Sequence, residues 1–472
     1  MRRLVAILMF APALLSAQGG KHPNYDDDIK PLFARRCFAC HSAGEMRSGL
    51  NLEAYAGVVK GGNSGDAVIP GRPTSSLLFK AISHEEGAPQ MPLGGAKLPD
   101  ADIALIRDWI QQGLLETALS VPKGPIGPSL EYKPTFLNKP AGDPAMPNGL
   151  PPVTLAETER ANPVTALAAS PWAPLLAVAG HERIYLYDLG KRAPAGELAF
   201  PEGIPYVLHF SRDGTTLLAA GGKGVQSGKV VLFDVKSGKR LATIGQEMDV
   251  VLAADVTADG KLVALGGPKK IVKVYSVADG KELYELKKHT DWITALEFSP
   301  DGTRLATGDR AGGILLWEST SGGTVGNLAE HKDSITSLSW RGDSQLLASG
   351  SEDGQIIVWN VGDGFPVATM AKAHQPKPPQ GTFGTPPGGV LSVQFAPDGR
   401  LVSVGRDSTI RIWGMDGKQK SASNPAPALL TKVAVSADGK LCIAGDFQGR
   451  LLIWDGKGLV TLSPQALVTA AR

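Results

Sequence analysis

The chain has 472 residues, of which 43% are hydrophobic and 20% are charged, with 48 Lys and Arg residues against 46 Asp and Glu residues. This length predicts more than one domain. The balanced charge argues against a protein that binds nucleic acid or an acidic membrane surface through a basic patch.

Residues 1–17 have the pattern of an export signal. Arg2 and Arg3 precede an apolar run from Leu4 to Leu15, and the small residues Ser16-Ala17 mark a cleavage site. As a helix this run would span about 18 Å, less than the roughly 30 Å of a hydrocarbon core. No later stretch is long and apolar enough to span a membrane. We therefore expect a mature bacterial protein with no transmembrane segment, in the periplasm or otherwise outside the cytoplasm.

The most informative motif is Cys37-Phe38-Ala39-Cys40-His41. In a Cys-x-x-Cys-His sequence the two thiols attach c-type haem covalently and the histidine ligates the iron. A zinc site would need about four ligands, yet the only other cysteine is Cys442, which is expected to be a buried strand residue. A redox dithiol would need a βαβ context that is missing here. The motif predicts one covalent haem c held by Cys37 and Cys40, with His41 as the proximal ligand.

Residues 24–117 are predicted to form a small all-α domain around this motif. A short helix from Asp28 to Phe33 should lead into it, and a second should begin near Thr74 or Ser75. A third is expected from about Pro99 to Gln112, ended by Gly113. Its apolar face should pack on the haem-bearing helix through Ile103, Ile106 and Ile110.

The sixth position on the iron has four candidate answers, which are Met91, Met46, His84 or no ligand. Met46 is five residues beyond His41 and would have to reach the opposite face of the ring within a short loop. Met91 is followed by a proline in a glycine- and proline-rich loop long enough to cover the distal side. We therefore expect Met91 to be the second iron ligand, because a thioether in this position is typical of cytochromes c.

Residues 118–162 are predicted to be a linker. Nine prolines fall between Pro122 and Pro152, which favours a semi-rigid polyproline II spacer over helix or sheet.

Residues 163–466 carry a sevenfold repeat. An aromatic residue ends the third strand of each unit: Tyr187, Phe233, Tyr275, Trp317, Trp359, Trp413 and Trp454. Five of the intervals are 41–46 residues, close to the 40–45 typical of four-stranded repeats, and the one of 54 contains the insertion Gln375–Gly389. The fold class is therefore multidomain, with the small all-α cytochrome c domain followed by an all-β seven-bladed β-propeller. Either Val153–Leu155 or Leu459–Leu462 could supply the strand that closes it.

Three blades carry a His, a Thr or Ser, an Asp and a Trp at matching positions. We expect these residues to form hydrogen-bond networks within each blade rather than metal sites. The sets are His289, Thr307, Asp309 and Trp317; His331, Ser349, Asp353 and Trp359; and His374, Ser403, Asp407 and Trp413.

Residues 24–116 resemble the planctomycete-type cytochrome c domain in the order of their motifs, among them Cys37–His41, Ser48–Leu52, Ile69–Gly71, Met91-Pro92 and Trp109–Gly113. The resemblance implies that His41 and Met91 are the iron ligands. Residues 164–463 resemble WD40 repeat proteins, although the first three blades lack the tryptophan and have weak histidine positions.

These patterns predict an exported c-type haem protein that transfers one electron and uses its WD40 propeller to dock a protein or polymer; its redox partner stays open. No catalytic residue is assigned, and an electron carrier is favoured over an enzyme. One alternative is a cd1-like reductase with a second cofactor in the propeller channel, which His209, Glu297 and Gln394 could face. The other is a peroxidase at the c haem, which requires that Met91 leave the iron.

Overall fold

A computed structural model describes residues 23–85, 88–118, 120, 122–123, 132, 139–140, 142–153, 162–376, 378 and 386–462. The chain divides into two compact units, Met1–Gly127 and Pro128–Arg472, and each is described by itself. The predicted signal peptide and most of the predicted linker lie outside the described residues. Among the described helices, none is long and apolar enough to cross a membrane.

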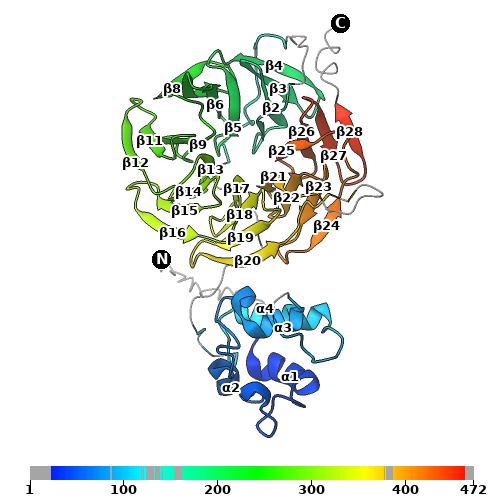
Figure 1. The fold of residues 1–472 in the computed structure, drawn as a ribbon. Coiled ribbons are helices and arrows are strands. Elements are labelled where there is room, and N and C mark those ends of the chain that lie inside the picture. The colour runs from blue at the N-terminus through cyan, green and yellow to red at the C-terminus, as the bar shows by residue number, and fades with distance from the viewer. Residues whose placement is uncertain are drawn as a thin grey trace, which may run out of the picture. The chain divides into compact units, whose positions relative to one another are not determined.

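The first unit is helical (Figure 1). Its elements are the π-helical turn η1 (Tyr25–Ile29), α1 (Lys30–Arg36), the 3-10 turn η2 (Arg47–Gly49), α2 (Tyr55–Lys60), the 3-10 turn η3 (Pro73–Ser75), α3 (Leu77–Ser83) and α4 (Asp100–Gln111). The helix expected from Asp28 to Phe33 is thus divided between η1 and α1. The helix expected from Pro99 is α4, where Pro99 is the residue before the first turn and Gly113 follows with a φ of 82°.

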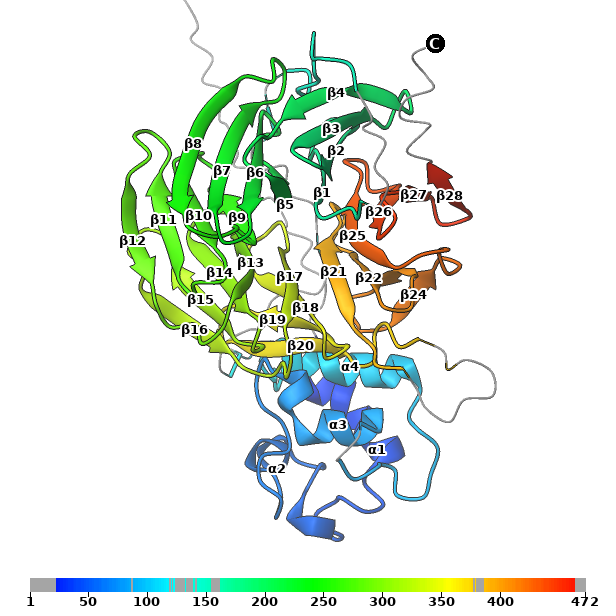
Figure 2. The same cartoon turned by 45° about the horizontal axis from the view of Figure 1, so that its top comes forward.

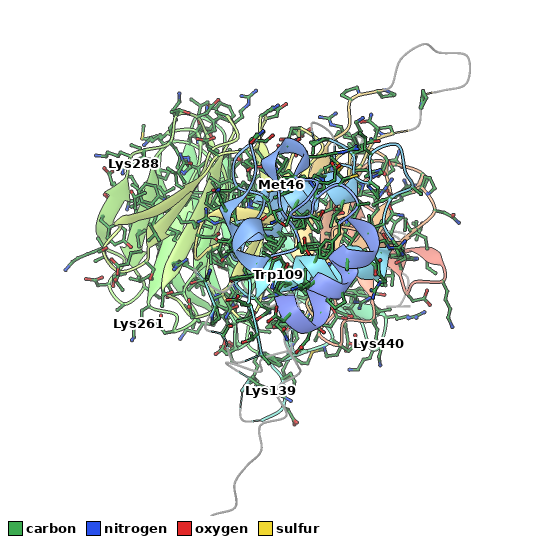
Figure 3. The ribbon with its side chains drawn as sticks, turned by 90° about the horizontal axis from the view of Figure 1, so that it is seen from below. Met46, Trp109, Lys139, Lys261, Lys288 and Lys440 are labelled. Carbon is green, nitrogen blue, oxygen red and sulfur yellow. The ribbon has the colours of Figure 1, made fainter. Side chains whose placement is uncertain are left out.

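An aromatic cluster forms the core of the helical unit. The Tyr25 ring lies 5.5 Å from that of Tyr55 and 6.0 Å from that of Trp109. Each of the three side chains also donates a hydrogen bond to a backbone carbonyl, as buried tyrosine and tryptophan usually do. Trp109 is fully buried among the helices (Figure 3). The cluster fixes α4 against η1 and α2, and Tyr25 N donates to Leu115 O at 2.8 Å, which joins the two ends of the unit.

The second unit is a seven-bladed β-propeller, as predicted. Each blade is an antiparallel sheet of four strands that follow one another in the chain. The first four blades are β1–β4 (Leu167–Ala169, Leu175–Gly180, Arg183–Asp188, Ala193–Ala199), β5–β8 (Ile204–Phe210, Thr216–Lys223, Ser227–Asp234, Arg240–Glu247), β9–β12 (Ala253–Val256, Leu262–Gly266, Val272–Ser276, Glu282–Leu286) and β13–β16 (Ile293–Phe298, Arg304–Asp309, Ile314–Glu318, Thr324–Leu328).

The last three blades are β17–β20 (Ile335–Trp340, Leu346–Ser351, Ile356–Asn360, Phe365–Met370), β21–β24 (Val390–Phe395, Leu401–Gly405, Ile410–Trp413, Gln419–Ala422) and β25–β28 (Leu430–Val435, Cys442–Asp446, Leu451–Trp454, Leu459–Leu462). The first strand of each blade lies at the middle of the ring and the fourth at its rim (Figures 1 and 2). Cys442 begins the second strand of blade seven and is 4% exposed, as expected for a small core residue.

Adjacent blades pack closely because a glycine of one blade faces a branched side chain of the next. A Cβ atom on Gly308 would lie 2.6 Å from a methyl group of Ile335, and one on Gly445 would lie 2.4 Å from a methyl group of Val164. Neither position has room for a larger residue. Since Gly445 belongs to blade seven and Val164 precedes β1, the same contact joins the two ends of the propeller.

The ring closes without exchange of a strand. The outer strand of blade seven is β28, so Leu459–Leu462 fills the position for which the sequence offered two candidates. In the other candidate, Thr154 and Leu155 lie outside the described residues. Two hydrogen bonds join the ends, from Thr431 Oγ1 to Val164 O at 2.8 Å and from Val164 N to Asp446 O at 3.1 Å.

Candidate haem site

The Cys-x-x-Cys-His motif follows directly on α1. Cys37 is the last capping residue of that helix, and its N–H donates to Phe33 O at 2.7 Å. Its own carbonyl then accepts from Cys40 N at 3.1 Å and from His41 N at 3.0 Å. These bonds fold the motif into a compact turn, so both thiols and the imidazole emerge from one short segment.

The thiols and the imidazole are in a state that suits attachment of haem. Both thiols are free and half-buried, and burial raises the pKa of Cys37 to about 11. His41 Nδ1 is buried and has no hydrogen-bond partner. His41 as a whole is partly exposed, so the imidazole has an unpaired nitrogen and is not enclosed by the core.

The surroundings of the motif are apolar. A rim of partly buried side chains lies against the fully buried core of the helical unit: Cys37, Phe38, Leu50, Val59, Phe79, Met91 and Leu105. Partly buried apolar surface of this kind is what a porphyrin would cover. The donor set, the partly exposed imidazole and the apolar rim therefore fit a c-type haem.

The loop that carries Met91 is held in place from two sides. Met91 N donates to Ala81 O at 3.0 Å, at the end of α3, and Met91 O lies 3.0 Å from His84 Nε2. A carbonyl oxygen can only accept, so His84 Nε2 carries the proton. This hydrogen bond gives His84 the role of positioning Met91, which differs from the ligand role considered in the sequence.

Met46 has a different environment. Its backbone forms an isolated bridge with His41, and its side chain is 55% exposed. Because its backbone pairs with that of His41, Met46 lies next to the residue predicted to be the proximal ligand. Among the methionines considered, the packing against the core favours Met91.

The predicted polar networks are present in blades four, five and six. In blade four, His289 Nδ1 lies 2.9 Å from Asp309 Oδ2 and Nε2 lies 2.7 Å from Thr307 Oγ1, which also accepts from Trp317 Nε1 at 2.7 Å. Because the carboxylate only accepts, Nδ1 donates to it and the threonine hydroxyl donates to Nε2. The bonds thus run in one direction, from Trp through Thr and His to Asp.

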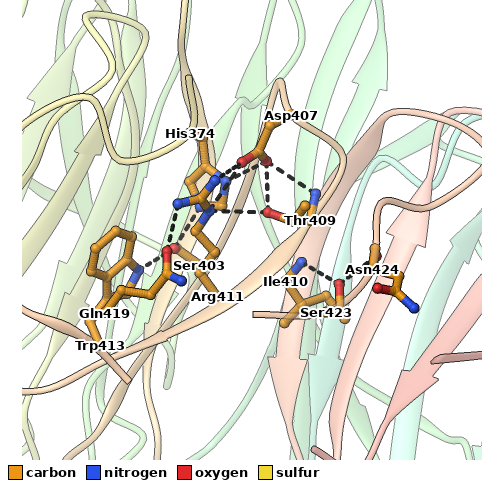
Figure 4. A network of polar contacts seen from close by, with 10 residues as sticks. All are labelled: His374, Ser403, Asp407, Thr409, Ile410, Arg411, Trp413, Gln419, Ser423 and Asn424. Atoms are coloured by element: carbon orange, nitrogen blue, oxygen red, sulfur yellow. Dashed lines mark hydrogen bonds and ion pairs between the residues drawn. The ribbon is translucent and has the colours of Figure 1, made fainter. Parts of the chain in front are cut away.

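Blade six has the same network, and two further side chains, Thr409 and Arg411, donate to its aspartate (Figure 4). Ser403 takes the place of threonine between His374 and Trp413, at 2.7 Å from each nitrogen. Arg411 Nε donates to Asp407 at 3.0 Å, and the hydrogen bonds and charges around this carboxylate outweigh its burial and lower its pKa to about 2. Burial lowers the pKa of His374 below its usual value, which keeps the ring neutral. These are the properties of structural residues.

His209, Glu297 and Gln394 line one cavity at the centre of the propeller, as the alternative enzyme hypothesis required. Two of them are already in ion pairs. His209 Nδ1 contacts Asp255, and Glu297 Oε1 accepts from Arg212 Nη2 at 3.0 Å. Burial disfavours a charged His209, but the charge of Asp255 outweighs it and raises the pKa of His209.

The sequence interpretation missed Asp255, Arg212 and Lys432. Lys432 lines the same cavity, and Asp255 holds His209 at its wall. The sequence did contain one signal. Asp255 and Lys432 each interrupt an otherwise apolar first strand, Asp255 at the position that matches His209 and Lys432 two residues before it. Both positions place the side chain on the same face of the strand as His209. Their shared surroundings depend on ring closure, which a local pattern does not reveal.

Taken together, a helical unit with a Cys-x-x-Cys-His turn and a seven-bladed propeller define a multidomain protein of cytochrome c and β-propeller type. The family model described as planctomycete cytochrome C matches residues 37–92. The model described as WD domain, G-beta repeat, matches residues 280–318, 322–360 and 377–414. The chain therefore joins a planctomycete cytochrome C domain to a WD40 propeller.

The WD40 matches cover the third strands that carry tryptophan in blades four, five and six, which are the blades with complete polar networks. The chain is also similar to the small ribosomal subunit protein RACK1 of Drosophila melanogaster, with 34% identity over 88 residues, and to that of Caenorhabditis elegans, with 32% over 88 residues. Each match covers 17% of this chain and 28% or 27% of the relative, so the chain spans about a quarter of those proteins.

Proposed function

We propose that this protein is an exported one-electron carrier with one covalent c-type haem, and that its propeller is the platform that docks a partner. The observation that carries the proposal is the pairing of two elements in the helical unit. One is the turn from Cys37 to His41, whose partly exposed imidazole has a nitrogen without a hydrogen-bond partner. The other is Met91, which two hydrogen bonds hold against the same core.

The chain's own residues have separate tasks in this proposal. Cys37 and Cys40 would hold the haem covalently, and His41 and Met91 would ligate its iron. When bound, haem supplies a centre that gains and loses a single electron. A thioether ligand favours the reduced iron, and a site with both axial positions filled leaves no place for a small substrate. His84 keeps the Met91 loop in position through the carbonyl of that residue.

Absorption spectra of the exported protein test the proposal. We expect one haem per chain and a methionine–iron charge-transfer band that disappears in Met91→Ala. Met46→Ala is the matched control, because this methionine is exposed, and it should keep the band. A band that survives Met91→Ala would refute Met91 as the ligand. A second chromophore would favour the enzyme alternative with a cofactor in the propeller.

The docking role of the propeller rests on its fold, since WD40 matches indicate a protein-interaction domain. Exposed aromatic residues on a propeller suit this role, and Trp292 is one of them: it is 40% exposed and its ring lies 5.2 Å from the guanidinium of Arg310. Removal of residues 163–466 should abolish binding of the redox partner and leave the haem spectrum unchanged. Undiminished partner binding by the shortened chain would contradict the docking role.

A further inference from the structure

The centre of the propeller holds a cavity of about 400 Å³, large enough for a small ligand. Part of its wall comes from one level of the ring, the third residue of β17, β21 and β25. These residues are Ser337, Ser392 and Lys432, and they belong to three consecutive blades. At the matching position the other four blades supply Ala166, Val207, Ala253 and Ala295. This level is therefore polar along one arc and apolar along the other.

The two hydroxyl groups of the polar arc can donate to a ligand. Ser337 Oγ accepts from Val393 N at 2.8 Å, and Ser392 Oγ accepts from Val433 N at 3.3 Å. Each bond joins a blade to the next one and uses a lone pair of the oxygen. Neither hydroxyl donates a hydrogen bond to any residue in the described ranges, so each can donate to a ligand, and donation is what an anion requires.

The charged groups elsewhere in the channel are engaged with each other. Asp255 Oδ2 accepts from Phe298 N at 2.8 Å and its other oxygen contacts His209. Glu297 accepts from Arg212 and, at 3.3 Å, from Trp340 N. These carboxylates join neighbouring blades, and each pairs with a basic side chain beside it, His209 or Arg212.

Lys432 differs from these groups. Its ammonium makes no hydrogen bond or ion pair with any part of the chain that the structure describes. Burial lowers the pKa of Lys432, and no carboxylate offsets that effect. Lys432 is partly exposed at the channel wall, so an anion that enters the cavity can pair with its cation.

We propose that the propeller channel binds a small organic carboxylate. Its carboxylate group lies at Lys432, Ser392 and Ser337, and its carbon chain packs against the apolar arc of the same level. A single cation with two hydroxyl donors matches one carboxylate. The four small or branched apolar residues opposite exclude a ligand that is polar all round, such as inorganic phosphate, and the lysine repels metal cations. This site is independent of the haem and of the proposed electron transfer.

Calorimetric titration of the full-length protein tests the proposal, at constant ionic strength and with butyrate as the probe. Butyrate should bind saturably, while butyramide, which has the same shape and no charge, should not. Lys432→Gln should weaken butyrate binding by about tenfold or more, because it removes a charged hydrogen-bond donor. Lys440→Gln is the matched control on the same blade, since Lys440 is an exposed surface lysine (Figure 3), and it should bind as the wild type does.

Three results would overturn the proposal. The first is no saturable binding of butyrate to the wild type at tens of millimolar. The second is equal binding to Lys432→Gln. The third is binding of phosphate through Lys432 in preference to butyrate, which would replace the carboxylate by an inorganic anion. Lys432→Met is a second variant in case the glutamine variant does not fold, and it should also lose butyrate binding.

Discussion

Replacement of Thr307 by valine removes one hydroxyl group from blade four and keeps the shape of the side chain. The oxygen of Thr307 is the partner of both Trp317 Nε1 and His289 Nε2, each at 2.7 Å. The surroundings exclude water, because Thr307 is 0% exposed and Trp317 is 2% exposed. In Thr307→Val, both nitrogen atoms are therefore left buried without a partner.

The expected loss of stability follows from these two groups. A buried polar group without a partner costs about 1–3 kcal/mol, so Thr307→Val should lower the free energy of unfolding by roughly 2–6 kcal/mol. Thr307→Ser keeps the hydroxyl and loses only a methyl group, which costs about 1 kcal/mol in a core. Valine preserves the volume and serine does not, so packing alone would give the opposite order.

Chemical denaturation of the full-length chain separates the two explanations. Tryptophan fluorescence and far-ultraviolet circular dichroism would follow the propeller, and a shifted midpoint with an unchanged slope would report a change in stability. The reasoning is refuted if Thr307→Ser is destabilised as much as Thr307→Val or more.

Two further predictions concern the same propeller. Burial lowers the pKa of His374 below 6.5, so on acidification the unfolded chain binds a proton first and stability falls below about pH 6.5. Asp407, with a pKa of about 2, keeps its charge there. As the pH is lowered below about 6.5, the difference in free energy of unfolding between wild type and His374→Gln should therefore shrink by up to about 1.4 kcal/mol per pH unit. A difference between their denaturation midpoints that stays constant over this pH range would contradict the prediction. Thr431 donates to Val164 O across the junction that closes the ring, and Thr294 donates to Ile335 O at an internal junction. Thr431→Val and Thr294→Val each remove one of these hydrogen bonds, so each should lower the free energy of unfolding by about 0.5–1.5 kcal/mol. A cost several times larger for Thr431→Val in the same assay would show that the closing junction differs from the others.

The sequence predicted the propeller well because its signals are local and repeated. Each third strand ends in an aromatic residue, and each turn such as Asp301-Gly302 recurs at the same point of a blade. Glycine is needed in that turn, since Gly302 has a φ of 72°. The spacing within one blade also brought His289, Thr307 and Trp317 together, because their strands are neighbours in the chain. Patterns that depend only on neighbouring strands can be interpreted without a structure.

The helical unit was predicted less completely. Helix α2 is only six residues long, from Tyr55 to Lys60, and contains Gly57 and two valines, which are poor helix formers. Its sequence gives no amphipathic signal, and the helix is stabilised by tertiary contacts: Tyr55 donates to Leu114 O at 2.5 Å and packs on Tyr25. The role of His84 was missed for a related reason. Its bond to the Met91 carbonyl depends on the left-handed conformation of His84 at the end of α3, where φ is 58°.

The channel shows why the surroundings of a residue are harder to predict than its position. The sequence placed Glu297 and Gln394 at equivalent points of their first strands, and both line the cavity. Equivalent position did not give equivalent surroundings, because each side chain meets residues of other blades, which are 43 to 85 residues away in the case of Glu297. Glu297 meets Arg212 and a backbone N–H of blade five. Lys432, in blade seven, meets no carboxylate in the described chain. A repeat makes the backbone nearly the same in all seven blades, and so any chemical function of the channel depends on the residues that break the repeat.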